Sequence, residues 1–136
     1  MIKLPQGEME LFIRTDFSII SQWQKICEEV TDIENECPPM ITIINDPKFS
    51  QLKISDLPQF SKDQVTNTFV MLVDEMSSSH PEHPINCVDL TDDFGRYFRV
   101  IPSEVCSVSA NLGLSNMDFS EFADNVDPDG IFRGFK

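Results

Sequence analysis

The stretch MELFIRTDFSIISQWQKICEEVT, residues 9–31, decides the fold class. Its first part, residues 9–14, is rich in β-forming apolar side chains, which predicts a strand. Thr15, Asp16 and Ser18 then provide side chains that suit a helix start. The apolar residues that follow predict an amphipathic helix over residues 18–31, because they recur at helical spacing: Ile19, Ile20, Trp23, Ile26, Cys27 and Val30. A strand followed directly by a helix indicates a mixed α and β fold.

Beyond this unit, short apolar runs bounded by turn residues predict further strands. They lie at residues 40–44, 68–73, 85–90 and 97–101. The last two are close enough to form a hairpin, with Gly95 free to take a positive φ in the turn. A short helical turn is expected at residues 55–60.

Two helices are expected after the hairpin. The first begins at Pro102, and the second spans Asp118–Val126, where Asp118 and Glu121 have capping-box spacing. The apolar tail is expected to dock on the body of the protein. The element order is therefore β-α-β-β-β-β-α-α. This order predicts one α+β domain over residues 1–136, with a mainly β sheet of about five strands and helices packed on it.

The charge of the chain limits its partners. There are 23 acidic and 10 basic residues, giving a formal net charge of -13. Between Asp74 and Asp129 only two bases occur, Arg96 and Arg99. Such acidity disfavours direct binding to nucleic acid or to an anionic membrane surface, because both need clustered Lys and Arg. The 40% hydrophobic content and 11 Phe residues predict an ordinary folded core instead of disorder.

The first residues and the spacing of the cysteines predict where the protein is located and whether its thiols are reduced. The start of the sequence has no long apolar run, so we expect neither a signal peptide nor a membrane span, and a cytoplasmic protein. The four cysteines are far apart and form no Cys-x-x-Cys pair: Cys27, Cys37, Cys87 and Cys106. Buried reduced thiols are the expected state, with disulfides or metal ligation as the alternative.

Short motifs offer little catalytic chemistry. Residues 125–130 resemble the start of a calcium-binding EF-hand loop, but the twelfth position is Lys136, where a bidentate Glu is needed. His80 and His83 are two imidazoles without further obvious ligands, and zinc needs three or four. No nucleophile elbow or Gly-rich phosphate loop is present. We therefore predict no cofactor, no metal and no enzymatic activity.

Three aspartates are the main alternative to that prediction. Asp16, Asp46 and Asp74 each follow a predicted strand directly. If the strands are parallel neighbours, the three carboxylates converge at one edge of the sheet, where magnesium sites form in several α/β folds. Asp16 also suits a helix cap, and Asp46 before Pro47 suits a turn. A metal-dependent hydrolase that uses these residues remains the second hypothesis.

Several longer stretches carry a resemblance to a known family. They include LFIRTDFS at 11–18, NDPKF at 45–49, HPEHPINCVDL at 80–90, GRYFRVIPSEV at 95–105 and NMDFSEFADNVDPDGIFRGF at 116–135. Together they resemble an uncharacterised bacterial domain family, common in actinobacteria, that is catalogued only as a domain of unknown function. The resemblance implies no activity and no catalytic residues. More loosely, the chain is similar in kind to the small acidic immunity proteins of bacteria.

The leading functional hypothesis combines charge with that similarity of kind. We expect an immunity or inhibitor protein that uses an acidic surface to occlude a basic toxin domain, specifically a nuclease delivered by neighbouring bacteria. An acidic adaptor without a toxin is a further alternative. The protein is expected to be a monomer or a weak homodimer. The predicted partner-binding residues are Asp92, Asp93, Phe94, Asp118, Glu121, Asp124, Asp127 and Asp129.

Overall fold

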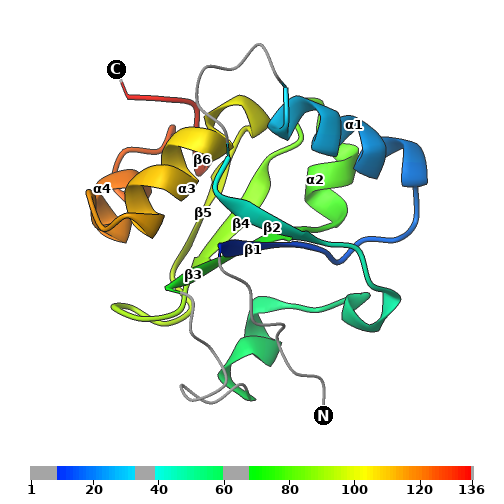
Figure 1. Cartoon of the computed structure of the whole chain (residues 1–136), viewed down its shortest axis with the longest axis horizontal. Coiled ribbons are helices and arrows are strands. Elements are labelled where there is room, and N and C mark those ends of the chain that lie inside the picture. Colours follow the sequence, from blue (N-terminus) through cyan, green and yellow to red (C-terminus); the bar gives the residue numbers. More distant parts are fainter. Residues whose placement is uncertain (1–8, 33–38, 60–67, 136) are drawn as a thin grey trace.

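A computed structural model describes residues 9–32, 39–59 and 68–135, and its centre is a mixed six-stranded sheet (Figure 1). The strand order is β2-β1-β3-β4-β5-β6. The strands are β1 (Glu10–Arg14), β2 (Ile41–Ile44), β3 (Phe69–Val73), β4 (Ile85–Asp89), β5 (Tyr97–Val100) and β6 (Ile131–Phe132). Helices pack on this sheet, so the predicted α+β class is confirmed.

The first three strands form the parallel part of the sheet. β1 lies between β2 and β3 and is parallel to both. β4 is antiparallel to β3 and to β5, as a hairpin requires, and β6 is parallel to β5. The short β6 was not predicted, although the expected docking of the tail is confirmed because Ile131 and Phe132 pair with Arg99 and Val100.

After β1 the chain crosses one face of the sheet, and after β2 it crosses the opposite face (Figure 1). Helix α1 (Ile20–Val30) connects β1 to β2 and packs with Phe12 on the face that carries the larger core. After β2, the 3-10 helices η1 (Pro47–Phe49) and η2 (Ile54–Gln59) pack with Leu11 and Ile13 on the other face. Side chains alternate along a strand, so neighbouring residues of β1 serve both cores.

Helices α3 (Val105–Gly113), preceded by the 3-10 turn η3 (Pro102–Glu104), and α4 (Phe119–Ala123) complete the larger core. There Phe122 is fully buried among other rings. Its ring centroid lies 5.2 Å from that of Phe132, 5.4 Å from that of Phe135 and 6.2 Å from that of Phe98. One α4 side chain therefore joins β5, β6 and the tail.

Two local predictions are wrong. Helix α1 begins at Ile20, and its N-cap Ile19 makes no side-chain cap bond. Asp16 instead accepts hydrogen bonds from the amide and hydroxyl of Ser18, at 3.1 and 2.7 Å, which order the loop before the helix. Second, no helix was expected between the strands at residues 68–73 and 85–90, but α2 (Glu75–Ser79) forms there and begins with a capping box between Asp74 and Ser77.

Cys27 and Cys87 are free thiols, and Cys37 lies outside the described residues. Burial raises the pKa of the Cys27 thiol to about 11, and burial also raises the pKa of the Cys87 thiol. Both thiols are therefore protonated and poor nucleophiles at neutral pH.

Candidate functional site

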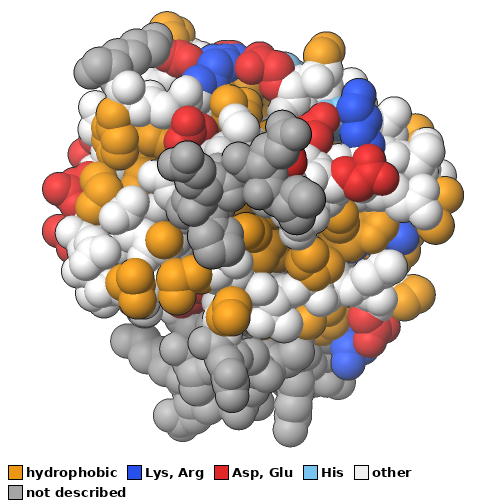
Figure 2. Space-filling view, turned by 45° about the horizontal axis from the view of Figure 1, so that its top comes forward, with side chains coloured by type: hydrophobic (Ala, Val, Ile, Leu, Met, Phe, Trp, Pro, Cys, Tyr) orange, Lys and Arg blue, Asp and Glu red, His pale blue; other side chains and the backbone are white. Residues whose placement is uncertain are grey.

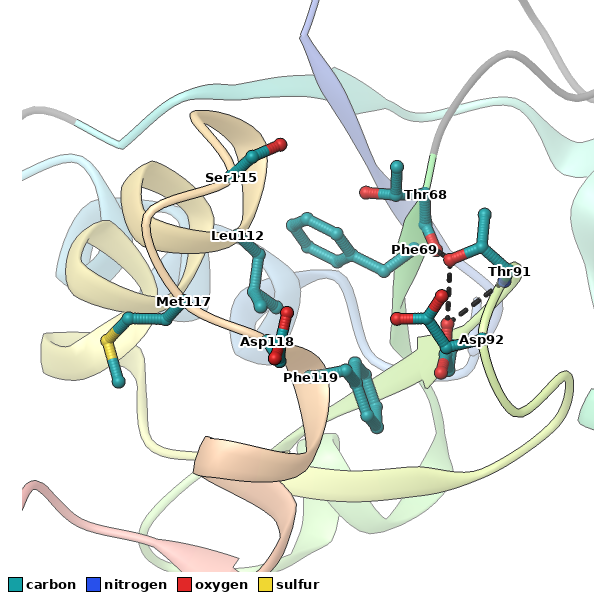
Figure 3. Close-up of a pocket in the computed structure, with 10 residues that line it drawn as sticks. Thr68, Phe69, Thr91, Asp92, Leu112, Ser115, Met117, Asp118 and Phe119 are labelled. Carbon is teal, nitrogen blue, oxygen red and sulfur yellow. Dashed lines mark hydrogen bonds between the residues drawn. The ribbon is translucent and has the colours of Figure 1, made fainter.

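A cavity of about 320 Å³ opens beside the start of β3, where the β4–β5 turn faces the end of α3 (Figure 3). Three separate parts of the chain form its wall. Figure 3 shows the Phe69 ring between the end of α3 and the β4–β5 turn. The lining residues are Thr68, Phe69, Asp89, Thr91, Asp92, Leu112, Ser115, Met117, Asp118 and Phe119.

The lining combines an apolar base with acidic side chains. Phe69, Leu112 and Phe119 are buried and belong to the larger core, so the base of the cavity is rigid. Three aspartates contribute the charge, and no Lys, Arg or His occurs among the described lining residues. Carboxylates close to low-dielectric walls produce a stronger field than the same charges in open water. The cavity is therefore suited to a positively charged group with an apolar stem.

Asp89 organises the turn and does not itself offer a free carboxylate. It is only 2% exposed, and its Oδ1 accepts hydrogen bonds from the amide and hydroxyl of Thr91 at 3.0 and 3.3 Å. Its Oδ2 accepts a third bond, from the Asp93 amide at 3.0 Å. Gly95 takes the predicted positive φ, 91°, and closes the turn. This arrangement leaves Asp92 and Asp93 exposed to solvent.

The other side of the cavity is set by the start of α4. Asp118 is the N-cap residue, and the Glu121 carboxylate accepts a hydrogen bond from its amide at 2.7 Å. The predicted capping-box spacing is thus confirmed. Asp118 and Glu121 are both exposed, so their charges remain available to a partner. Phe94, in the β4–β5 turn, is 40% exposed, which is the condition under which it could anchor a partner.

The remaining predicted acids are engaged elsewhere within the chain. Asp124 forms an ion pair with Arg96. Asp127 and Asp129 both pair with Arg133, each at 2.7 Å. The structure therefore gathers Asp92, Asp93, Phe94, Asp118 and Glu121 around or near the cavity, whereas the other three acids already have basic partners.

The surface shown in Figure 2 agrees with this division of charges. Acidic and basic side chains are scattered among hydrophobic ones on that face instead of forming one continuous acidic patch. The net charge alone does not define an interface there. The cavity, with its local excess of carboxylates, is the better defined candidate.

Arg133 ties the tail to two other parts of the chain. Besides Asp127 and Asp129 it binds Glu82, at 2.8 Å, in the loop before β4. Hydrogen bonds from Arg133 lower the pKa of the Glu82 and Asp129 carboxyls, and the same bonds raise the pKa of the guanidinium. These groups lie at the surface, so solvent weakens the attraction between them.

Replacing Arg133 with glutamine should leave three neighbouring carboxylates without their cation. We expect a lower melting temperature, with a larger deficit at low salt, because mobile ions screen the repulsion between the exposed acids. Thermal unfolding at low and high NaCl measures this difference. The control is Lys48→Gln, which removes a cation from a single exposed pair with Asp46. A deficit independent of salt would contradict the electrostatic explanation.

The three strand-end aspartates follow strands that are parallel neighbours, as the second hypothesis requires. Asp16 and Asp74 line a second cavity, of about 150 Å³, but Asp46 does not. Asp46 begins η1 instead, where its Oδ1 accepts a hydrogen bond from the Lys48 amide at 3.1 Å. Over residues 9–32, 39–59 and 68–135, no three His, Cys, Asp or Glu side chains are placed to hold a metal ion together.

Sequence reasoning missed the apolar base of the larger cavity and the residues from the loop after η1 that line the smaller one. Phe69, Leu112 and Gln51 carry no functional signal in the sequence, because each acquires its role from segments that meet only in the fold. The helices of the described segments include none with the length and apolar character needed to cross a membrane.

Comparison with known proteins places the chain in a family. The profile of a domain of unknown function, DUF6924, matches residues 9–135. No curated protein matches the chain. The expected resemblance to an uncharacterised domain family is confirmed at that level. Because the match spans nearly the whole chain, the protein belongs to the DUF6924 family of domains of unknown function.

Proposed function

We propose that this protein is an inhibitor of the immunity type, which binds a basic partner protein through the acidic cavity between the β4–β5 turn and α4. One observation carries the proposal. Two exposed aspartates, Asp92 and Asp118, stand over an apolar base, and no basic residue occurs among the described lining residues. A Lys or Arg side chain matches both features, because its stem is apolar and its end is cationic.

Charge also favours this kind of partner over the alternatives. A guanidinium inserted between Asp92 and Asp118 would form charge-assisted hydrogen bonds, and its stem would contact the Phe119 ring. The net charge of -13 would accelerate encounter with a basic protein. Phe94 would add an apolar contact at the edge of the interface. A complete interface would bury roughly 1,200–2,000 Å² in total.

The proposed partner is a toxin with a nuclease domain, of the kind delivered by neighbouring bacteria. Nucleases bind phosphates with Lys and Arg, and carboxylates of this protein would occupy those positions and block the substrate. Binding would take place in the cytoplasm, and the free thiols of Cys27 and Cys87 are in keeping with a reducing compartment. The mechanism requires no catalysis by this chain.

A capture experiment from the native host at low salt tests the function. The tagged wild-type protein should retain a basic protein whose nuclease activity falls when the complex forms. Capture of basic proteins without inhibited activity would support an adaptor and contradict the inhibitor. If no basic protein is retained, the proposed function is wrong.

A paired variant tests the site. Asp92→Asn with Asp118→Asn should slow association with the captured partner about tenfold at low salt, because both carboxylates line the cavity. The matched control, Glu28→Gln with Glu29→Gln, removes the same charge from α1, outside this cavity. Association rates at several salt concentrations distinguish the variants. Equal slowing by both pairs would show a net-charge effect and would contradict the cavity as the site.

A further inference from the structure

The turn between α3 and α4 contains a residue in an unfavourable backbone conformation. Ser115 has a φ of 58°, in the left-handed region that residues with a Cβ rarely adopt. It directly follows Leu114, the C-cap residue of α3, and glycine is the usual residue at this position of a helix end. Because glycine would relieve the strain, the presence of a serine side chain here calls for a functional explanation.

Hydrogen bonds hold the turn in this conformation. The Ser115 amide donates to the Leu112 carbonyl at 3.2 Å. The amides of Asn116 and Met117 both donate to the Asn111 carbonyl, at 2.9 and 3.1 Å. These bonds close the end of α3, so the backbone of the turn is fixed before any partner binds. A partner would therefore meet a preformed surface, which lowers the entropic cost of association.

The Ser115 side chain belongs to the acidic cavity of the proposed inhibitor. The residue is exposed and lines that cavity. Figure 3 shows its hydroxyl oxygen pointing towards the side of the cavity on which Thr68 lies. Among the described residues the Ser115 hydroxyl has no hydrogen-bond partner. Since a hydroxyl oxygen can accept hydrogen bonds, Ser115 offers an acceptor to a donor group that enters the cavity.

The acceptors around the cavity favour one kind of cation. Asp92 and Asp118 lie on opposite sides of it, and Ser115 adds a third acceptor from another segment (Figure 3). A guanidinium carries several N–H donors in one plane and reaches separated acceptors at once, whereas an ammonium is a compact and strongly hydrated charge. A volume of about 320 Å³ is ample for one long side chain. The arrangement therefore suits arginine better than lysine.

We infer that Ser115 determines specificity for an arginine of the basic partner. Its Oγ accepts a hydrogen bond from the guanidinium, while Asp92 and Asp118 balance the charge. The inference rests on the proposed function, because it names the partner side chain that enters the same cavity. It also explains the strain at Ser115, since glycine would suit the backbone but would lose the acceptor.

Nuclear magnetic resonance of the full chain tests the inference with two probes, acetyl-arginine amide and acetyl-lysine amide. The two carry the same charge, so diffuse attraction to the acidic surface is equal for both. In the wild type, the arginine probe should give saturable shifts centred on the amides of Thr91, Asp92 and Ser115. It should bind at least about threefold more tightly than the lysine probe, as expected for one additional hydrogen bond.

Ser115→Gly should bind the arginine probe at least about threefold more weakly and should lose the preference over lysine. Its melting temperature should not fall, because glycine adopts a positive φ readily. Ser115→Ala, which loses only the hydroxyl, should weaken binding to the same extent. The matched control is Gln51→Gly, because Gln51 has a φ of 68° and lines the other cavity. This control should bind the arginine probe as the wild type does.

Four results would overturn the inference: equal affinity of wild type and Ser115→Gly, equal affinity for the two probes, equal weakening by Gln51→Gly, or shifts centred outside the cavity. The probes require no natural partner, so this measurement is independent of the capture experiment. Binding of the arginine probe that does not depend on Ser115 would contradict this inference alone. Failure to capture a basic protein from the host would contradict the proposed function, whichever way the probes behave.

Discussion

Replacing Phe122 with alanine is expected to lower the free energy of unfolding by about 3–5 kcal/mol. Phe122 is fully buried, and its ring lies within ring-contact distance of Phe98, Phe132 and Phe135. The substitution removes apolar burial and leaves a cavity between α4 and the last two strands, which cannot close without moving β6. This is the largest loss of stability that a single truncation near the candidate site should cause.

Urea denaturation monitored by circular dichroism measures the change, with an unchanged slope showing that the folded state is still compact. Phe135→Ala is the control, because the same side chain is truncated at a position that is 52% exposed. It should cost about 1 kcal/mol, since less apolar surface leaves water. Equal losses for the two variants would contradict the central role of Phe122.

The sheet could be predicted largely from local pattern. Its five longer strands are apolar runs between turn residues, and both faces of β1 and β3 are buried, so these runs are nearly continuous. β6 was missed because two residues, Ile131–Phe132, are too short for any periodicity to register. Helix α2 was missed although Asp74 and Ser77 form its capping box, because the serines and prolines that follow are typical of a loop.

The candidate site could be predicted only in its exposed parts. The sequence predicted the turn that carries Asp92, Asp93 and Phe94, whereas the exposure of the Phe94 ring is known only from the structure. No pattern in the sequence reveals that Arg133 reaches Glu82, which is 51 positions away. The sequence analysis predicted that the three strand-end aspartates converge if their strands are parallel neighbours. The strands are parallel neighbours, but the direction of each side chain also depends on the residues that follow it. Pro47 begins η1 at once, so Asp46 caps that helix and does not face Asp16.

Replacing Arg99 with leucine should destabilise the fold, because it removes the ion pair between Arg99 and Asp74. Two hydrogen bonds, at 2.8 and 2.9 Å, join the side chains, and Arg99 also donates to the Pro84 carbonyl at 3.1 Å. β5 is thereby fixed to the end of β3 across β4. Loss of one partner costs about 3–5 kcal/mol in fully buried pairs. Here the side chains are 15% and 28% exposed, so we expect about 2 kcal/mol.

The pH dependence separates lost charge pairing from lost packing. Burial raises the pKa of Asp74, but the hydrogen bonds and charge of Arg99 outweigh burial, and the pKa lies below its ordinary value of 3.8. A lowered pKa stabilises the fold above that value, and the contribution disappears as the pH falls through the folded-state pKa. In Arg99→Leu the unpaired carboxylate has a raised pKa, and protonation relieves its cost. The difference in stability between wild type and variant should therefore be largest near neutral pH and should shrink towards about pH 3.

Urea midpoints for wild type, Arg99→Leu, Asp74→Asn and the double variant, in metal-free buffer at both pH values, complete a double-mutant cycle. Asp74→Asn keeps an acceptor for the Ser77 amide, so it isolates the charge from the helix cap. A coupling energy that is largest near neutral pH and shrinks as the pH falls towards about 3 is the expected result. If instead Arg99→Leu costs as much in the Asp74→Asn background as in the wild type, Arg99 acts through packing and through Pro84, because the coupling energy contains only the interaction between the two varied side chains.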